Sequence, residues 1–466
     1  MNNHRHTLAI RLSALALILT PWLSGCSGPQ TQPTETIELP TLNAFQNGLL
    51  THSGELQADW WQQLGSPVLN RLMAAAAIDN LDIRQALLRI DKAQQSLNQQ
   101  SADRWPQFSA RASTGQSRNT DSSNGWNNSS GLSLSASYTV DLWSRRATLI
   151  EQSALDLQIA RSDLAAARIS LQGELASQYL NWLALRSRLQ LAQQNLNASQ
   201  EMEDLVRIRF EAGDASGIEL AQQHNTTLSL QSSLMSLQQQ QDVTARALAA
   251  LLGQSDLSVD LGNEGFEQIR IPAIANVQPA ALLEHRPDVQ SATLTLRNSY
   301  LAIYVAESNR WPSLSLSAAL SPVDLLSLAG DWTLSLTEAL SVSLFDGGSS
   351  KAEVEAAKLD EQVARLDYRK TVISAMQETL DALEAVDYEA RQTRLAEQTF
   401  DNNQQLLELA RIRYDSGDTD FSDLLTSQRT FFSARDSLVS QRLGHLQALI
   451  ELYGALGTAP EAASAG

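Results

Sequence analysis

Few residues in this sequence have the types and spacing that catalysis or metal binding requires. The six histidines show neither metal-ligand spacing nor the spacing of a catalytic triad: His4, His6, His52, His224, His285 and His445. His285 precedes Arg286-Pro287-Asp288, a turn that predicts the entry to a helix rather than a ligand site. The sequence also contains no glycine-rich phosphate-binding loop. These residues therefore predict no enzyme activity, no metal site and no cofactor.

The single cysteine, Cys26, has a chemistry of its own. It follows a basic start with Arg5 and Arg11, an apolar run over residues 12–19 and the small residues Ser24 and Gly25. This order is typical of a secretory signal, and the apolar run is too short to span a bilayer. The ending Leu-Ser-Gly-Cys resembles a bacterial lipobox, in which the cysteine is acylated and becomes the first mature residue. The alternative is an ordinary signal that happens to contain a cysteine.

The residue after Cys26 bears on where such a lipoprotein would be sorted. Ser27 stands there instead of an aspartate. Under the bacterial sorting rule this implies the outer membrane. The acylated N-terminus would then be held in the inner leaflet of that membrane.

Two carboxylates follow two acidic turns that contain glycine. Glu219 comes six residues after Gly213, and Asp423 comes six residues after Gly417. Ser216-x-x-Glu219 is a capping box, and Asp420-x-x-Asp423 is similar to one. Both acids can therefore stabilise the N-terminus of a helix.

The two turns belong to two copies of one unit. Trp311-Pro312 repeats Trp105-Pro106 after 206 residues (311 minus 105). The turn that ends at Gly417 repeats the one that ends at Gly213 after 204 residues (417 minus 213), and Gly457 repeats Gly253 at the same offset. A tandem duplication uses each unit of the fold twice. The net charge of -18 speaks against nucleic acid as a partner.

Each copy contains a hairpin of two strands. In the first copy, apolar residues alternate with polar ones, as in a strand with one apolar face: Leu132, Leu134, Ala136, Tyr138 and Val140. Strands are predicted at about 106–115 and 131–141, and at about 312–320 and 332–345. A strand of about ten residues crosses a bilayer when it is tilted. Glu338 interrupts the apolar face of the last strand, which predicts a bulge or a position at an interface.

Long helices follow each hairpin, over about 146–252 and 348–456. Between Ser349 and Ser416 there is neither glycine nor proline, and apolar residues recur at helical spacing. At about 1.5 Å per residue, roughly 65 residues reach on the order of 100 Å, which exceeds the core of a globular domain. Each long helix should stop at its glycine turn, since glycine is common just past a helix end. The sequence therefore predicts two long antiparallel helical hairpins.

The order of these segments predicts the domain organisation. A helical pattern over about 67–104 precedes the first hairpin and ends at Trp105-Pro106, because proline disfavours helix in the residue before it. The division runs from N- to C-terminus as follows: signal peptide 1–25, lipidated tether 26–55, first repeat 56–257, linker 258–278, second repeat 279–457 and tail 458–466.

Four amphipathic strands cannot sit in a membrane as an open sheet. Each unpaired backbone group at an edge costs several kcal/mol in hydrocarbon. The barrel must therefore close between subunits, and two, three or four chains would give about 8, 12 or 16 strands. The alternative is a soluble β-sandwich with coiled-coil arms, which leaves the lipobox and the strands of membrane length unexplained.

The combination of several motifs resembles that of a known family. They are Tyr138-Thr-Val-Asp-Leu-Trp-Ser-Arg145, Leu344-Phe-Asp-Gly-Gly348, Leu282-Leu-Glu-His-Arg-Pro-Asp-Val289 and the two Arg-Ile-Arg-aromatic-x-x-Gly turns. Over about residues 55–457 the chain resembles the TolC and OprM family of outer-membrane efflux lipoproteins, with Ser144 where the family usually has glycine.

The resemblance implies a mainly α fold with a transmembrane β part. It implies a homotrimer, in which a 12-stranded barrel in the outer-membrane lipid continues into a periplasmic tunnel of 12 helices. It also implies docking with a periplasmic adaptor protein and an inner-membrane efflux transporter. The adaptor would dock at the periplasmic turns, whose residues are Gly213, Asp214, Gly417 and Asp418.

The resemblance further implies an aperture near these turns. Three-fold symmetry would gather six carboxylates from Glu219 and Asp423, a ring that favours cations. Tyr414 matches a tyrosine that latches the family's aperture, and Glu219 matches its carboxylate partner. Thr419 and Thr426 stand where some members have a latching arginine and a second acid, which implies a looser latch. The capping role of both acids remains open beside the gating role.

Three functions are weighed for such a conduit. It exports drugs or other small molecules, it is the outer-membrane conduit of a type I protein secretion system, or it is a trimeric structural adhesin. Acylation favours the first, because the drug-efflux branch of the family is usually lipidated. An adhesin would have its barrel at the C-terminus and would not need duplicated hairpins. The conduit itself would be passive, with energy supplied by the inner-membrane partner.

Overall fold

The computed structural model describes residues 59–117, 126–255, 258–272, 286–322 and 332–457. Cys26, His285, the predicted signal and the predicted tether lie outside the described residues.

The chain divides into two compact units. In unit 1 the described residues come from Ile90–Ile159 and Ala292–Tyr368. In unit 2 they come from Thr41–Arg89, Ala160–Ser291 and Arg369–Gly466. Each unit thus combines segments of both sequence copies.

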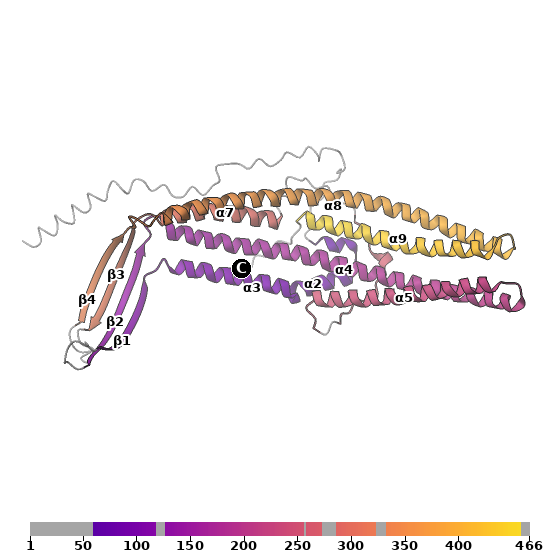
Figure 1. Ribbon diagram of the computed structural model, residues 1–466, viewed down its shortest axis with the longest axis horizontal. Coiled ribbons are helices and arrows are strands. Elements are labelled where there is room, and N and C mark those ends of the chain that lie inside the picture. The colour runs from indigo at the N-terminus through magenta and orange to yellow at the C-terminus, as the bar shows by residue number, and fades with distance from the viewer. Residues whose placement is uncertain (1–58, 118–125, 256–257, 273–285, 323–331, 458–466) are drawn as a thin grey trace, which may run out of the picture. The chain divides into compact units, whose positions relative to one another are not determined.

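Unit 1 contains a four-stranded antiparallel sheet of order β1-β2-β3-β4 (Figure 1). Its strands are β1 (Gln107–Ser117), β2 (Asn127–Val140), β3 (Ser313–Pro322) and β4 (Trp332–Ser341). The two predicted hairpins are joined where β2 pairs with β3, so one sheet combines both copies. β2 begins earlier than its alternating pattern indicates, and β4 ends before the expected position near 345.

Glu338 lies in an unbroken register. It is paired with Leu316, between the pairs Leu314 with Leu340 and Ala318 with Leu336. No extra residue is inserted, so the predicted bulge is wrong. β4 is an edge strand of this sheet, and Glu338 is exposed there. An exposed edge position accommodates the carboxylate without a change of register.

Three helices of each copy follow the same order and have nearly the same lengths. The first copy has α3 (Leu81–Ala102), α4 (Arg145–Ala212) and α5 (Gly217–Leu251), with 22, 68 and 35 residues. The second has α7 (Pro287–Ser308), α8 (Ser349–Asp415) and α9 (Phe421–Ala455), with 22, 67 and 35 residues. In Figure 1, α5 runs back along α4 and α9 along α8. The predicted helical hairpins are confirmed.

The predicted helix over 67–104 is two helices. α2 (Pro67–Asp79) is followed by Asn80, and α3 begins directly after that residue. The Asn80 side-chain oxygen accepts hydrogen bonds from the backbone N–H groups of Asp82 and Ile83 at 2.9 and 3.0 Å. Asparagine is a favoured N-cap because its side chain replaces the missing helical acceptor. The apolar pattern continues across the break and therefore conceals it.

Asn80 and Arg286 close the two copies in equivalent ways. The Asn80 amide donates to the carbonyl oxygen of Leu251 at 2.8 Å, and the Arg286 guanidinium donates to that of Ala455 at 2.8 Å. Leu251 and Ala455 end α5 and α9, and their numbers differ by 204 (455 minus 251). The residue just before α3 or α7 thus binds, through its side chain, the last carbonyl of α5 or α9. That carbonyl has no partner within its own helix.

The glycines that follow these carbonyls have little room. Gly253 and Gly457 have φ of 67° and 71°, in the left-handed region. A Cβ on Gly253 would lie 2.5 Å from the carbonyl oxygen of Asp79, and one on Gly457 would lie 3.0 Å from Cα of Arg286. Both positions require glycine for backbone conformation and for close approach.

A core in unit 2 surrounds the segment before α2. The ring of Trp60, in the short helix η3 (Trp60–Leu64), stacks on Tyr453 with centroids 5.0 Å apart. Glu264, just before the short helix η4 (Phe266–Gln268), accepts hydrogen bonds from Val68 N–H at 3.0 Å and from the Tyr179 hydroxyl at 3.0 Å. Burial raises the pKa of Tyr179, which favours the neutral hydroxyl that donates to Glu264. Glu264 and η4 belong to the predicted linker between the copies, so this part of the linker is packed against the core.

Ser144 joins β2 to α4 in a left-handed conformation, with φ of 56°. This conformation costs an L-residue on the order of 1–2 kcal/mol, and glycine avoids that cost. The glycine that the resembling family usually has at this position is therefore the residue that the turn favours.

Alanine at Gly457 should destabilise the protein more than alanine at Gly417. Gly417 has φ of 79°, but a Cβ there would meet nothing within 4 Å. We expect Gly417→Ala to cost about 1 kcal/mol from backbone strain, and Gly457→Ala about 2–4 kcal/mol because overlap with Arg286 is added. The thermal unfolding midpoint followed by circular dichroism measures the difference. Equal midpoints for the two variants would contradict the role of close packing.

Candidate gate at the helical turns

The two turns that end α4 and α8 have the same backbone geometry. Gly213 and Gly417 have φ of 83° and 79°. In the first turn Asp214 N–H donates to the Arg209 carbonyl at 2.8 Å, and in the second Asp418 N–H donates to that of Arg413 at 2.8 Å. This pattern is a Schellman motif, which ends a helix with glycine in the left-handed region. All four predicted docking residues, Gly213, Asp214, Gly417 and Asp418, are exposed.

Arg209 and Tyr414 connect the first turn to the second. A guanidinium N–H of Arg209 donates a hydrogen bond to the Tyr414 hydroxyl. The same guanidinium lies 5.2 Å from the centre of the tyrosine ring, within cation–π range. The prediction singled out Tyr414 but not Arg209, although Arg209 stands in the repeated Arg-Ile-Arg motif. The predicted contact between Tyr414 and Glu219 stays a prediction.

The matching arginine of the second copy, Arg413, makes a different contact. Arg413 donates to the carbonyl oxygen of Asp418, within its own turn, at 3.2 Å. The duplication therefore places an arginine at both turns, and only the tertiary structure assigns Arg209 to the contact between them.

An apolar cluster lies beside this contact. Val206 of α4 is 1% exposed and packs with Phe421 and Leu425 of α9. Partly buried residues complete the cluster: Met202, Ala215, Leu220 and Tyr414. The centre of the Phe421 ring lies 5.7 Å from that of Tyr414. The turn ends of the two helical hairpins are thus held together by packing as well as by Arg209.

Glu219 and Asp423 lie in the first turns of α5 and α9. Ser216 Oγ accepts the backbone N–H of Glu219 at 3.2 Å, so the first half of the predicted capping box is formed. Asp420 makes no such side-chain bond, but the Thr419 hydroxyl donates to the exposed Asp423 carboxylate at 2.6 Å.

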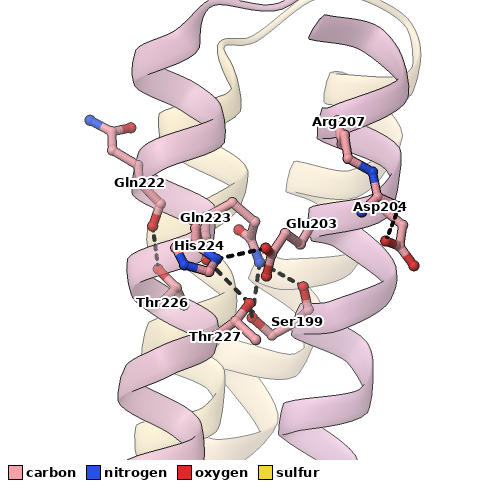
Figure 2. A network of polar contacts seen from close by, with 9 residues as sticks. All are labelled: Ser199, Glu203, Asp204, Arg207, Gln222, Gln223, His224, Thr226 and Thr227. Atoms are coloured by element: carbon pink, nitrogen blue, oxygen red, sulfur yellow. Dashed lines mark hydrogen bonds and ion pairs between the residues drawn. The ribbon is translucent and has the colours of Figure 1, made fainter. Parts of the chain in front are cut away.

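A buried polar network joins α4 to α5 further from the turn (Figure 2). The Gln223 amide, whose side chain is fully buried, donates to the Ser199 carbonyl and hydroxyl at 2.9 Å each. His224 lies 2.8 Å from Glu203. Burial acts to raise the pKa of Glu203, but hydrogen bonds from Thr227 and His224 outweigh it and hold that pKa below its ordinary value. The first hairpin is therefore fastened by directional bonds.

Two further contacts tie the first hairpin to α9. Arg188 of α4 forms a two-pronged ion pair with Asp436, at 2.6 and 2.9 Å. Arg429 donates to the Thr226 hydroxyl of α5. Planar arginine–carboxylate pairs of this kind fix orientation as well as distance. Any separation of the hairpins has to break these bonds.

Among the described residues, no group of three or more His, Cys, Asp or Glu is arranged to hold a metal ion. None of the helices in the same part of the chain is long and apolar enough to cross a bilayer.

Comparison with known proteins places the chain in a family. The family model described as outer membrane efflux protein matches residues 72–254 and 279–458, one stretch for each copy. The chain belongs to the outer membrane efflux protein family. It is 30% identical to the pyoverdine export outer membrane protein OpmQ of Pseudomonas aeruginosa, over 95% of this chain and 96% of that protein.

Two further similarities agree with this assignment. The chain is 28% identical to the toluene efflux pump outer membrane protein TtgC of Pseudomonas putida, over 96% of this chain and 95% of that protein. Its structure is similar to that of the outer-membrane channel OprN, with a TM-score of 0.82, 25% identity and coverage of 92% and 99%.

Membership of the family establishes the setting of the turns. The protein is an outer-membrane efflux channel that extends into the periplasm. It acts as a homotrimer with a periplasmic adaptor and an inner-membrane transporter. Three four-stranded sheets supply the 12 strands of the barrel. The expected family, fold class and assembly are thereby confirmed, and the family consists of channel proteins.

Loss of the Arg209–Tyr414 contact should loosen the turns. Tyr414→Phe removes the hydrogen bond but keeps the ring, whereas Arg209→Ala removes both the hydrogen bond and the cation–π contact. The hydrogen bond and the cation–π contact each contribute about 1 kcal/mol. In each protomer, the ratio of separated to bound turns should therefore rise roughly five-fold in Tyr414→Phe and roughly twenty-five-fold in Arg209→Ala. The frequency of openings in planar bilayers measures this shift.

Arg413→Ala is the matched control, because Arg413 occupies the same position in the second copy and donates to the Asp418 carbonyl within its own turn. Its opening frequency should stay near that of the wild type. The interpretation fails if Arg413→Ala and Arg209→Ala open the channel equally often.

Proposed function

We propose that this channel exports small molecules, drugs among them, from the periplasm to the exterior, and that it has no catalytic activity of its own. One observation supports the cargo class. Almost the whole chain is similar to TtgC and OpmQ, which are named for efflux of toluene and export of pyoverdine. Solutes pass passively, since the inner-membrane transporter supplies the energy.

In this proposal the exposed turns are the docking sites of the adaptor. Gly213, Asp214, Gly417 and Asp418 are exposed, and the two turns share one backbone geometry. An adaptor with repeated binding elements would therefore find two similar targets on each protomer. Binding there is next to the Arg209–Tyr414 contact, so docking and separation of the turns are linked.

Glu219 and Asp423 would form the selective ring of the aperture. Both lie one turn into a return helix, and three copies bring six carboxylates to the axis. Asp423 is exposed and is hydrogen-bonded to Thr419, which leaves its charge available. A ring of carboxylates attracts cations and repels anions. Tyr414 would act as the latch, with Arg209 as the partner observed in this chain.

The N-terminus would be anchored by covalent lipid on Cys26. A single acylated residue adds to the membrane attachment that the barrel already provides. The proposed domains of the chain are the signal 1–25, the tether 26–55, the repeats 56–257 and 279–457, the linker 258–278 and the tail 458–466. The two separate matches of the family model support the two repeats.

Neutralising the ring should change ion selectivity. In planar bilayers under a KCl gradient, the wild-type trimer should give small, cation-selective openings. Asp423→Ala with Glu219→Ala should change the single-channel conductance, because alanine is smaller and uncharged. It should also move the reversal potential toward zero, because the fixed negative charge at the narrowest point is removed. Asp214→Asn with Asp418→Asn removes the same charge from the turns and should leave the reversal potential unchanged. Unchanged conductance and selectivity in the alanine pair would show that both acids only cap helices.

The cargo class is tested in cells that lack this chain. Loss of the protein should make them more sensitive to toxic organic compounds, and the wild-type chain should restore tolerance. Their secreted proteins should stay the same, because a small-molecule duct is not needed for protein secretion. Loss of a secreted protein with unchanged tolerance would favour the protein secretion function.

A further inference from the structure

A cavity of about 600 Å³ lies in unit 1 where the strands end. It is bounded by Val140 at the end of β2, Ser313 at the start of β3 and Ser341 at the end of β4. In Figure 1, β2 ends on the side of the sheet from which α4 leaves. Because the sheet forms part of an outer-membrane barrel and the helices extend into the periplasm, this end of the strands marks the periplasmic boundary of the bilayer.

Two arginines line the cavity, and neither has an ion-pair partner in the part of the chain that the structure describes. Arg145 Nε donates to the Asn309 side chain at 2.6 Å, and Arg146 donates to the carbonyl oxygen of Asp103. Both are half-buried. A guanidinium has five N–H donors, so most donors on both groups remain available.

The nearby carboxylate is committed elsewhere. Asp141 also lines the cavity, but its two oxygens accept the backbone N–H groups of Arg146 and Ala147 at 3.1 and 3.0 Å. Asp141 thus caps the start of α4, where a negative charge is stabilised by the helix dipole. Two arginines and one aspartate leave the lining of the cavity with a net positive charge.

Aromatic side chains also line the cavity, and their contacts with one another are already formed. The rings of Trp143 and Trp311 meet edge to face with centroids 4.9 Å apart. Trp143 Nε1 donates to the Pro312 carbonyl at 2.8 Å, and the Tyr304 hydroxyl donates to the Trp143 carbonyl at 2.7 Å. Trp311 nevertheless remains 41% exposed, and Val342 on the same cavity remains 47% exposed. Tryptophan is enriched where a protein meets the bilayer interface.

We propose that this cavity binds the headgroup of an anionic phospholipid from the periplasmic leaflet, with its phosphate on Arg145 and Arg146 and its glycerol and first acyl carbons against Trp311 and Val342. Arginine binds phosphate oxygens in pairs of N–H donors. The apolar wall distinguishes a lipid from free phosphate, which would leave that wall unused. Among the residues that line the cavity, two arginines stand against one carboxylate, Asp141, which favours an anionic over a zwitterionic headgroup.

A bound lipid would fix the depth of the barrel in the bilayer. One lipid per protomer would hold the ends of three neighbouring strands at the level of the lipid phosphates. The site is separate from the helical turns, and it depends on membership of the outer-membrane family but not on the proposed cargo.

Native mass spectrometry of the delipidated trimer tests the proposal. With added phosphatidylglycerol, the wild type should retain up to three lipids per trimer. Arg145→Gln with Arg146→Gln should weaken retention on the order of tenfold or more, because the charged donors are lost. Arg145→Lys with Arg146→Lys should recover part of it. Arg161→Gln with Arg168→Gln removes the same charge from α4 outside the cavity and should bind as the wild type does.

Several outcomes decide between the ligand sources. Equal retention by the wild type and the Arg145/Arg146 glutamine variant would overturn the site. Full competition by millimolar inorganic phosphate would overturn the lipid assignment, as would equal retention of phosphatidylcholine. If the double variant does not form trimers, the single variants Arg145→Gln and Arg146→Gln are compared, and both should reduce retention. Bilayer conductance of the same variants should not change, which separates this site from the gate.

Discussion

The unpaired backbone edges of β1 and β4 constrain the rest of this protein. A sheet in hydrocarbon has to satisfy every N–H and C=O group, so a four-stranded sheet cannot remain alone there. Closure with two more copies removes the edges and makes the protein a trimer. The exposed Glu338 is understandable in the same terms, since β4 is an edge of one chain and becomes an interior strand only in the assembly.

The duplication is stabilised by contacts that close each copy on itself. Asn80 and Arg286 bind the last carbonyls of α5 and α9, and Gly253 and Gly457 allow the chain to approach there. One is a neutral amide and the other a charged guanidinium that also pairs with Asp288 and Glu378. The two copies therefore preserve a geometric relation while the side chains that satisfy it have changed.

The turn ends combine firm packing with a contact that can be broken. Val206, Phe421 and Leu425 are buried, whereas the Arg209–Tyr414 bond lies near the surface and is weakened by solvent. A contact of this kind suits the proposed latch, because it can be broken without unfolding the core. Further from the turn, the bonds of Gln223 and Ser199 keep the first hairpin intact during such a change.

The sequence by itself determined the elements, because strand and helix periods and glycine stops are local signals. It predicted both hairpins, both long helices and the turns at Gly213 and Gly417, and the offsets near 204 revealed the duplication. The break at Asn80 was missed, since an apolar pattern can continue across a capped junction. Only the tertiary structure decided that Arg209 meets Tyr414, that Glu338 lies in register without a bulge, and that Arg145 and Arg146 share a cavity with Trp311. Those relations join residues far apart in the chain, and they depend on packing that local periodicity does not encode.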